Sequence, residues 1–280
     1  MSEWKISAFA DEYADPAEEQ LGALKRFGIR YIEVRHIGGK NISVLTPEEV
    51  FALKEMLDDF GIKVSAIGSP IGKIKLDGDI KGHLEMARRV FEYANILETK
   101  YVRIFSFYPP EGKSIADREY EVFSLLASLL DLAKQYGITL CHENEAGIYG
   151  DTPARCLALL ERFGGDMKCV LDMGNFVLEG KDPYEAYGML REYIAYFHIK
   201  DALYGGAVVP AGKGEARIKE ILSEHRQYAQ DDFFVSLEPH LQTFSGLNAL
   251  VGRSFTNPYR YADAKEAFRD AVTKFMELIV

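Results

Sequence analysis

Short apolar segments alternate with longer segments of helical periodicity from one end of the chain to the other. The short segments predict strands at Lys5–Ala10, Tyr31–Arg35, Lys63–Ile67, Tyr101–Phe105, Thr139–Glu143, Cys169–Asp172, Ala195–Ile199 and Phe233–Glu238. The longer segments predict helices at Pro16–Phe27, Pro47–Phe60, Ile80–Leu97, Asp117–Tyr136, Thr152–Phe163, Pro183–Leu190, Arg217–His225 and Ala262–Leu278. Strict alternation of strand and helix is typical of a parallel sheet, and eight such units close a (β/α)₈ barrel.

Residues at the expected helix ends support this division of the chain. Asp15–Pro16 and Thr46–Pro47 each predict a capping side chain followed by a proline in the first helical position. Gly28, Gly61 and Gly137 each follow an aromatic residue and precede an isoleucine. This arrangement predicts a glycine that ends a helix directly before the next strand begins.

The alternation continues without a low-complexity stretch or a linker rich in Pro, Gly and Ser. We therefore expect one (β/α)₈ TIM-barrel domain over residues 1–280, a length at which such barrels are common. A doubly wound open sheet is the alternative, but it normally has fewer strands and a phosphate-binding loop, and neither GxGxxG nor GxxxxGK[ST] occurs. The longest irregular stretch, Leu241–Tyr261, is either a surface loop or a lid over the barrel mouth.

Ionisable residues end four consecutive expected strands: Glu143, Asp172, His198 and Glu238. Active sites of this fold lie at the carboxyl ends of the strands. One such residue alone is more often a cap, a surface group or a hydrogen-bonded core residue, but four at the same height predict a common site. Three carboxylates and one imidazole suit one divalent ion (Mn²⁺, Mg²⁺, Co²⁺ or Zn²⁺), which would also offset the repulsion among the carboxylates.

These motifs resemble the xylose isomerase-like barrel superfamily, which contains sugar isomerases and epimerases, inosose dehydratase and endonuclease-IV-type AP endonucleases. The resemblance covers nearly the whole chain. It is most specific at His142–Asn144, Leu171–Asn175, Phe197–Asp201 and Leu237–Pro239, with weaker similarity at Tyr31–Arg35 and Gly68–Lys73. It implies that the Glu before Asn, the Asp of the Asp-x-Gly-Asn turn, the His of His-x-Lys-Asp and the late Glu bind the metal. In this sequence they are Glu143, Asp172, His198 and Glu238.

The resemblance also implies a mechanism of proton transfer next to a metal-chelated carbonyl. Glu143 and Glu238 would then exchange the proton on opposite faces of the substrate, unless both are ligands only. Strand parity predicts that Lys200 faces the barrel mouth with His198 and that His142 points away from Glu143 into the barrel wall.

Four residues are candidates for binding substrate: Glu33, Arg35, Lys73 and Lys200. For each the alternative is a salt bridge with another charge or simple solvation. Asp201 is a candidate to orient a neighbouring group. Gly212–Glu215 is expected to form a tight turn, and the less favoured reading is an anion site at the start of the next helix.

The leading interpretation is a metal-dependent isomerase or epimerase of a sugar or sugar acid, acting in carbohydrate metabolism. Ketose 3-epimerases of this superfamily carry an Arg after the strand-seven His and a His after the strand-six Asp. Here Ala202–Tyr204 and Gly174–Asn175 stand in those places, which favours an unassigned isomerase or an inosose dehydratase-like lyase. A sugar-binding barrel without turnover is the third reading. An AP endonuclease of this superfamily holds three metal ions, and the six histidines of this chain fit one metal ion better than three. The net charge of −10 disfavours nucleic acid as a partner.

Composition and cysteine content bear on where the protein is expected to be found. No apolar run approaches the roughly 20 residues that span a bilayer, and the first residues do not resemble a secretory signal. Three cysteines without a CxxC pair (Cys141, Cys156 and Cys169) are expected to be reduced and buried, which points to a cytoplasmic protein. Superfamily members are commonly dimers or tetramers, although nothing in the sequence requires a homo-oligomer.

Overall fold

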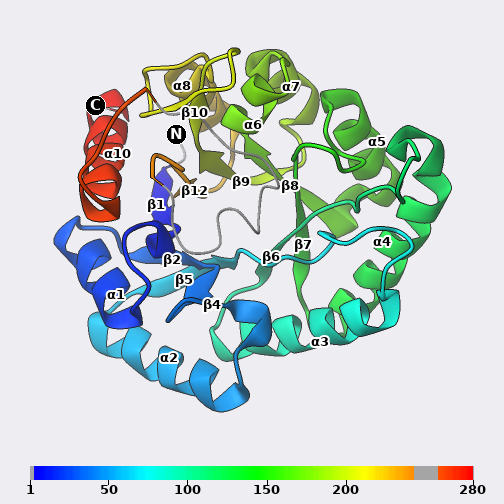
Figure 1. Ribbon diagram of the computed structural model, residues 1–280, viewed down its shortest axis with the longest axis horizontal. Coiled ribbons are helices and arrows are strands. Elements are labelled where there is room, and N and C mark those ends of the chain that lie inside the picture. Colours follow the sequence, from blue (N-terminus) through cyan, green and yellow to red (C-terminus); the bar gives the residue numbers. More distant parts are fainter. Residues whose placement is uncertain (1–2, 243–257, 280) are drawn as a thin grey trace.

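Eight parallel strands form the centre of the molecule in the computed structural model, which describes residues 3–242 and 258–279 (Figure 1). The strands are β1 (Trp4–Ala8), β2 (Tyr31–Val34), β5 (Lys63–Ile67), β6 (Tyr101–Ile104), β7 (Thr139–Glu143), β8 (Met167–Asp172), β9 (Ile194–Ile199) and β12 (Phe233–Leu237). Their order in the sheet is β1-β12-β9-β8-β7-β6-β5-β2. Because β1 and β2 lie side by side at the two ends of this order, the sheet curls into the (β/α)₈ TIM barrel expected from the sequence.

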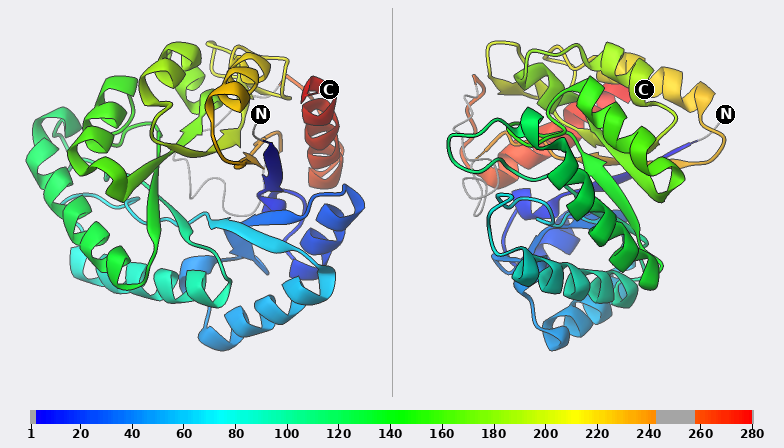
Figure 2. Two further views of the ribbon diagram at one scale, coloured as in Figure 1. Left: turned by 180° about the vertical axis from the view of Figure 1, so that it is seen from behind. Right: turned by 90° about the vertical axis from the view of Figure 1, so that its right-hand side faces the viewer.

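Helices surround the barrel in chain order, as the views from behind and from the side show (Figure 2). They are α1 (Ala17–Arg26), α2 (Pro47–Phe60), α3 (Ile80–Ile96), α4 (Glu119–Gln135), α5 (Pro153–Phe163), α6 (Met173–Leu178), α7 (Pro183–Leu190), α8 (Ile218–Tyr228) and α10 (Ala264–Ile279). The loops after β2 and β9 each contain a small two-stranded hairpin. These are β3–β4 (His36–Ile37 with Lys40–Asn41) and β10–β11 (Asp201–Ala202 with Val208–Val209). Single 3₁₀ turns occur at Ala10–Glu12, Ile42–Val44, Ile115–Arg118 and Gly164–Asp166.

Local chemistry at the helix ends explains most of the boundaries. The side chain of Thr46 accepts from the backbone of Glu49 and the Glu49 side chain accepts in return, so a capping box starts α2. Gly28, Gly61 and Gly137 adopt positive φ angles of 72°, 68° and 68°, a conformation that L side chains rarely adopt, which confirms that these glycines end helices.

Two features near the helix starts differ from the expectation. At Asp15–Pro16 the cap is Pro16 itself, no side chain caps the helix, and α1 begins at Ala17. The short helix α6 was not predicted. Its first turn is capped by the side chain of Asp172, which accepts from the backbone N–H of Asn175 at 2.8 Å. The strand-end aspartate therefore also starts a helix.

The core lies in two layers. The larger one fills the space between the outer face of the sheet and the helices. A smaller one, made of Ala66, Cys141, Val170 and Tyr196, lies inside the barrel. The three cysteines are buried free thiols, as expected. No helix among residues 3–242 and 258–279 has the length and apolar character needed to cross a membrane. Most of the predicted lid, residues 243–257 of Leu241–Tyr261, lies outside the described residues.

Candidate metal centre and active site

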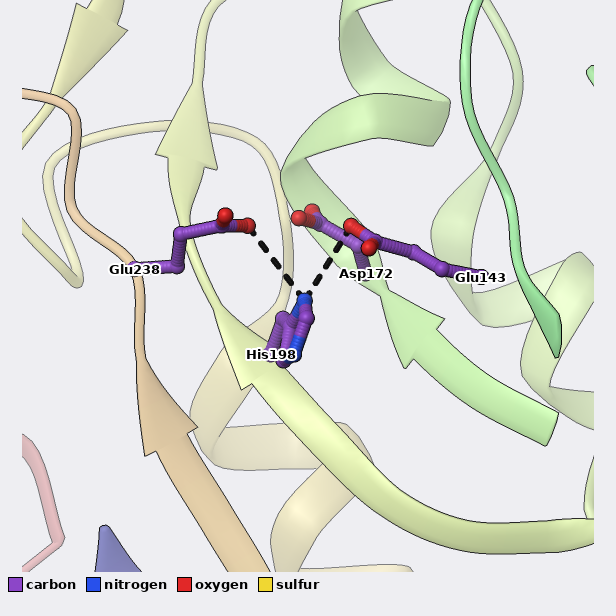
Figure 3. A group of neighbouring side chains, drawn as sticks. All are labelled: Glu143, Asp172, His198 and Glu238. Carbon is purple, nitrogen blue, oxygen red and sulfur yellow. Dashed lines mark hydrogen bonds and ion pairs between the residues drawn. The ribbon is translucent and has the colours of Figure 1, made fainter. Parts of the chain in front are cut away.

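The carboxyl ends of four adjacent strands bring Glu143, Asp172, His198 and Glu238 together (Figure 3). Glu143 and Asp172 are the last residues of β7 and β8, His198 lies one residue before the end of β9, and Glu238 directly follows β12. One oxygen or nitrogen atom from each of the four side chains lies within 4.8 Å of the others, and all four residues are buried. The sequence-predicted constellation is thus one compact cluster.

Both ring nitrogens of His198 face carboxylates. Its Nδ1 lies 3.1 Å from Glu143 Oε1 and 3.3 Å from Glu238 Oε2. Its Nε2 lies 3.1 Å from Oε2 of Glu33, whose Oε1 accepts a hydrogen bond of 2.9 Å from the Tyr196 hydroxyl. When Nε2–H donates to Glu33, the lone pair of Nδ1 points toward Glu143 and Glu238. This orientation is the usual one for a histidine that binds a metal.

The pKa of His198 reflects its three acidic neighbours. Burial alone lowers this pKa, but Glu33, Glu143 and Glu238 outweigh it and raise the pKa well above the usual 6.5. Without a metal, the imidazole is therefore protonated and bridges the carboxylates. The three carboxylates thus favour a positive charge at this position.

Lys200 also reaches into the cluster from the loop after β9. Its Nζ donates to Asp172 Oδ2 at 2.7 Å, to Glu238 Oε2 at 2.9 Å and to Asn175 Oδ1 at 3.2 Å. The neighbouring turn depends on Gly174, since a Cβ there would lie 2.7 Å from Cγ of Lys200 and 2.8 Å from its carbonyl oxygen. The Asp-x-Gly-Asn turn therefore requires glycine at position 174, because Lys200 lies directly against it.

Asp172 and Glu238 differ in their ionisation. Burial, together with the charges of Glu238 and Glu143, raises the pKa of Asp172 to about 7, although Lys200 opposes the shift. Burial also acts to raise the pKa of Glu238, but Lys200 and His198 outweigh it and hold that pKa well below the usual range. For Glu143, His198 and Arg103 outweigh burial and the net shift of the pKa is downward.

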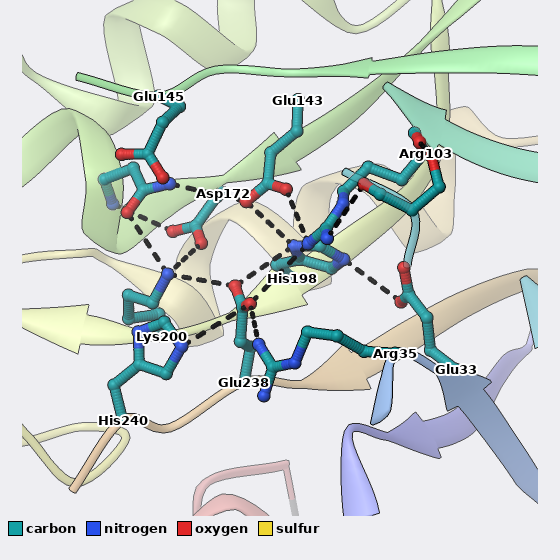
Figure 4. Close-up of polar contacts among 12 residues, drawn as sticks. Glu33, Arg35, Arg103, Glu143, Glu145, Asp172, His198, Lys200, Glu238 and His240 are labelled. Atoms are coloured by element: carbon teal, nitrogen blue, oxygen red, sulfur yellow. Dashed lines mark hydrogen bonds and ion pairs between the residues drawn. The ribbon is translucent and has the colours of Figure 1, made fainter. Parts of the chain in front are cut away.

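Two buried arginines, Arg35 and Arg103, border the cluster (Figure 4). Arg35 forks onto Asp11 through Nε and Nη2, at 2.8 and 3.1 Å, and donates through Nη1 to Glu238 Oε1 at 2.8 Å. Arg103 donates through Nη1 to Glu143 Oε2 at 3.1 Å. The two arginines thus contact the two glutamates of the cluster.

Sequence reasoning missed Arg103, Asp11 and Glu12. A signal was available for each. Arg103 alternates with Val102 and Ile104 in an apolar strand, which predicts a charge on the inner face of the barrel. Asp11 and Glu12 follow β1 as the other site residues follow their strands. Burial and the charges of Glu238 and Asp11 raise the pKa of Glu12 to about 8, against the effect of Arg35.

A small cleft opens above the cluster. Its lining residues come from several strand ends: Arg35, Lys73, Arg103, Phe105, Glu143, Glu145, Lys200, Glu238 and His240. Lys73 Nζ lies 3.2 Å from Glu145 Oε2 and 4.3 Å from the centre of the Phe105 ring. Three of the four candidate substrate residues therefore line this cleft. Glu33 does not, because it lies behind His198.

Three other predicted features lie nearby. His142 points away from the cluster, as expected, with its Nε2 2.9 Å from Ser106 Oγ. The Asp201 carboxylate accepts from the backbone N–H groups of Gly212, Gly214 and Ala216 at 2.8, 3.0 and 3.0 Å. The glycine-rich segment is therefore a tight turn, held by a carboxylate of the chain itself.

The donor set fits a divalent ion. Oxygen and imidazole ligands without thiolate suit Mg²⁺, Mn²⁺, Co²⁺ or Zn²⁺. The connected network also contains more carboxylates than permanent cations. Its carboxylates are Asp11, Glu12, Glu33, Glu143, Asp172 and Glu238. Its permanent cations among the described residues are Arg35, Arg103 and Lys200. A divalent ion at the four-residue cluster would offset most of this excess.

Comparisons with known proteins identify the family of the chain. The profile of the family described as xylose isomerase-like TIM barrel matches residues 21–271. A curated relative, the probable L-ribulose-5-phosphate 3-epimerase UlaE of Mycoplasma pneumoniae (strain ATCC 29342 / M129 / Subtype 1), is 26% identical over 157 residues. That match covers 53% of this chain and 50% of the relative, so the chain matches about half the length of that protein.

Solved structures resemble the whole chain. D-Allulose 3-epimerase from Methylomonas sp. in complex with D-allulose has a TM-score of 0.74 at 15% identity, covering 100% of this chain and 98% of that one. A xylose isomerase-like TIM barrel protein from Mycobacterium smegmatis in complex with magnesium has a TM-score of 0.71 at 16% identity, covering 100% of both chains. At these identities the similarity shows the fold alone.

Proposed function

The chain belongs to the xylose isomerase-like TIM barrel family, and from this premise we propose that it is a divalent-metal-dependent isomerase or epimerase of a small sugar. The observation that carries the proposal is the convergence of Glu143, Asp172, His198 and Glu238 at the barrel mouth. The epimerase named among its relatives and the magnesium-bound structure of the same fold support it.

In this proposal the four residues of the cluster hold the ion, with His198 binding through Nδ1. When bound, a divalent ion polarises the substrate carbonyl and so makes the neighbouring C–H bond more acidic. Glu33 and Tyr196 act behind His198, because their hydrogen bonds fix the ring. Lys73 and Lys200 reach the cleft and are proposed to contact substrate oxygens.

Glu143 and Glu238 are proposed to move the proton. Their carboxylates approach Nδ1 of His198 from two different strands, β7 and β12, as Figure 3 shows. One glutamate takes the proton from the carbon next to the carbonyl, and the other, protonated, gives its own proton to the opposite face. Each turnover thus inverts one carbon and leaves the two glutamates with exchanged protonation states, which solvent resets.

The first test uses metal-loaded protein in D₂O with a panel of free ketoses, ketose phosphates, sugar acids and inososes. We expect metal-dependent deuterium incorporation next to the carbonyl with a change of configuration. Loss of water from an inosose would identify the dehydratase alternative, and tight binding without exchange would identify a sugar-binding barrel. Absence of both exchange and dehydration across the panel would contradict the proposed function.

A second test uses variants of the two glutamates. Glu143→Gln and Glu238→Gln are each expected to abolish turnover and weaken metal binding, because each removes both a ligand charge and a proton acceptor. Glu145→Gln is the matched control for metal binding, since Glu145 lines the same cleft outside the four-residue cluster. Turnover is not compared in this control, because Glu145 pairs with Lys73. Full activity in either variant would remove that residue from the mechanism.

A further inference from the structure

The two glutamates of the cluster share one arrangement: in each, the two carboxylate oxygens face different partners. In Glu143, Oε1 faces His198 Nδ1 at 3.1 Å, and Oε2 accepts from Arg103 at 3.1 Å. In Glu238, Oε2 faces His198 Nδ1 at 3.3 Å and accepts from Lys200 at 2.9 Å, whereas Oε1 accepts from Arg35 at 2.8 Å. One oxygen of each carboxylate therefore faces His198, and the other accepts from an arginine (Figure 4).

Arg35 is rigidly held in this role. It is fully buried, its fork grips Asp11 through two hydrogen bonds, and its guanidinium lies 4.2 Å from the centre of the Phe9 ring. Its Nη2 also donates to Glu12 Oε1 at 3.3 Å, so the plane of the guanidinium is fixed and so is the direction of its Nη1. Among the described residues, Nη1 donates to Glu238 Oε1.

Arg103 is fixed by a different set of contacts. Its Nη2 donates to the carbonyl oxygen of Ser69 at 3.2 Å, and its guanidinium lies between the rings of Phe9 and Phe105, at 5.4 and 4.8 Å. Its Nη1 is nearer to Glu143 Oε2, at 3.1 Å, than to Glu238 Oε1, at 3.7 Å. Each glutamate thus has its own principal arginine.

We propose that Arg35 and Arg103 are positioning residues, each of which orients the proton-transferring oxygen of one glutamate, Arg35 for Glu238 and Arg103 for Glu143. This inference rests on the proposed function. A carboxylate that binds a metal through one oxygen can still rotate, and a fixed donor on the other oxygen restricts that rotation. Small errors in the placement of a reacting group can cost on the order of 100-fold in rate.

The test uses Arg35→Lys and Arg103→Lys, which keep the charge but cannot reproduce the fork or the stacking. In metal-loaded protein in D₂O, deuterium incorporation into each of the two epimers is measured separately. When one glutamate is misplaced, the other still removes a proton from its own face of the substrate. After exchange with D₂O, it returns deuterium to that face. In one variant, deuterium incorporation into one epimer is expected to be on the order of 10- to 100-fold faster than conversion of that epimer into the other. The other variant should show this imbalance with the opposite epimer.

Metal affinity provides a readout that is independent of turnover. Titration with Mn²⁺ is expected to give dissociation constants within about threefold of the wild type for both variants, because the metal-facing oxygens keep their partners. Arg155→Lys is the matched control: this arginine pairs with Asp151 and lies 5.8 Å from the centre of the Tyr149 ring, outside the cleft. It should exchange and convert both epimers like the wild type.

The outcomes separate the inference from the proposed function. Equal loss of exchange with both epimers, wild-type behaviour of both variants, or a tenfold loss of Mn²⁺ affinity would overturn the inference while the wild type still epimerises. Absence of metal-dependent exchange in the wild type would overturn both. If Arg35→Lys does not fold, Asp11→Asn loosens the same guanidinium and should give the same imbalance. If Arg103→Lys does not fold, Phe105→Leu takes its place, because it removes a ring that contacts the Arg103 guanidinium.

Discussion

At the scale of single residues, the orientation of His198 depends on groups that do not touch the cluster's open side. Glu33 binds the ring nitrogen that faces away from Glu143 and Glu238, and Tyr196 in turn binds Glu33. Both are buried. This chain of hydrogen bonds fixes which ring nitrogen is available as a ligand, so it should control metal affinity from behind the histidine.

We therefore predict that Glu33→Gln weakens Mn²⁺ binding by about 10- to 100-fold, the usual effect of losing such a partner. The amide can hold the ring but does not stabilise the required tautomer as a carboxylate does. Tyr196→Phe should have the smaller effect, since it removes only the hydrogen bond to Glu33. Calorimetric titration measures both. An affinity unchanged in Glu33→Gln would show that Glu33 does not prepare His198 for a metal.

The individual site residues were predictable to different degrees. Glu143, Asp172, His198 and Glu238 follow from one rule, the convergence of strand ends, and the structure places them together. The roles of Glu33 and Arg35 could not be read in the same way. Strand parity says that a side chain points inward, but it does not say whether the partner will be substrate, a carboxylate or a histidine ring.

At the scale of elements, the short helix α6 begins at the four-residue cluster. Its N-cap is the candidate ligand Asp172, and its second residue, Gly174, has no room for a side chain because Lys200 passes beside it. We predict that Gly174→Ala displaces Lys200 or the first turn of α6. Loss of thermal stability by about 1–3 kcal/mol is the expected size of such overpacking. Weaker Mn²⁺ binding should accompany it.

Gly188→Ala is the matched control for this prediction. Gly188 lies inside α7, and an added Cβ there would meet nothing within 4 Å. Alanine is preferred over glycine within a helix, so this variant should gain about 0.5–1 kcal/mol and keep its metal affinity. Equal effects of the two substitutions in thermal denaturation would show that the contact with Lys200 is not what limits residue 174.

Helix α8 carries a buried histidine that makes stability depend on pH. His225 packs against Phe197 and Phe233 at ring-centre distances of 4.9 and 4.7 Å, and burial lowers its pKa to about 4. The unfolded chain binds this proton near pH 6.5. Its contribution to folding is therefore complete above 6.5 and is lost, by up to about 1.4 kcal/mol per pH unit, as the pH falls toward 4.

Replacement of this histidine by an aromatic residue that cannot ionise tests the argument. His225→Phe should make the free energy of unfolding fall less steeply between pH 6.5 and 4 than in the wild type, with the smallest difference in slope above pH 7. Urea unfolding at a series of pH values gives the comparison. Some pH dependence should remain, because burial also lowers the pKa of His142 to about 4. Parallel curves for the two proteins would contradict this role of His225.

The elements themselves were largely predictable because their ends carry local chemistry. The bounds of α2 follow from Thr46 and Gly61, and the structure reproduces them. The element that escaped prediction, α6, is only six residues long and begins on a residue that the periodicity assigned to a strand. Asp15–Pro16 shows the opposite case, since a good capping sequence is present but the chain starts the helix one residue later.

At the scale of the whole molecule, the barrel concentrates negative charge at one end. Most of the strands contribute an ionisable group to the same mouth, and the carboxylates of the connected network outnumber its permanent cations among the described residues. Metal-free protein can reduce this excess by taking up protons. The raised pKa values of Glu12, about 8, of Asp172, about 7, and of His198 mark where these protons are expected to bind. If these four side chains bind a divalent ion as proposed, then folding, metal binding and proton uptake are linked.

From this linkage we predict that a divalent ion stabilises the protein and that the effect grows with pH. Asp172 must lose its proton to bind the ion, so affinity falls as the pH drops below about 7. An ion at 100 times its dissociation constant adds about 2.7 kcal/mol. That corresponds to a rise in melting temperature of about 5 °C for a chain of this size. Differential scanning fluorimetry with Mn²⁺ at pH 6 and 8 should show the larger rise at pH 8. A chelator should reverse it.

Asp172→Asn should lose both the rise and its pH dependence, whereas Glu145→Gln should keep them. An equal rise at both pH values in the wild type would mean that the ion binds elsewhere than among these four side chains.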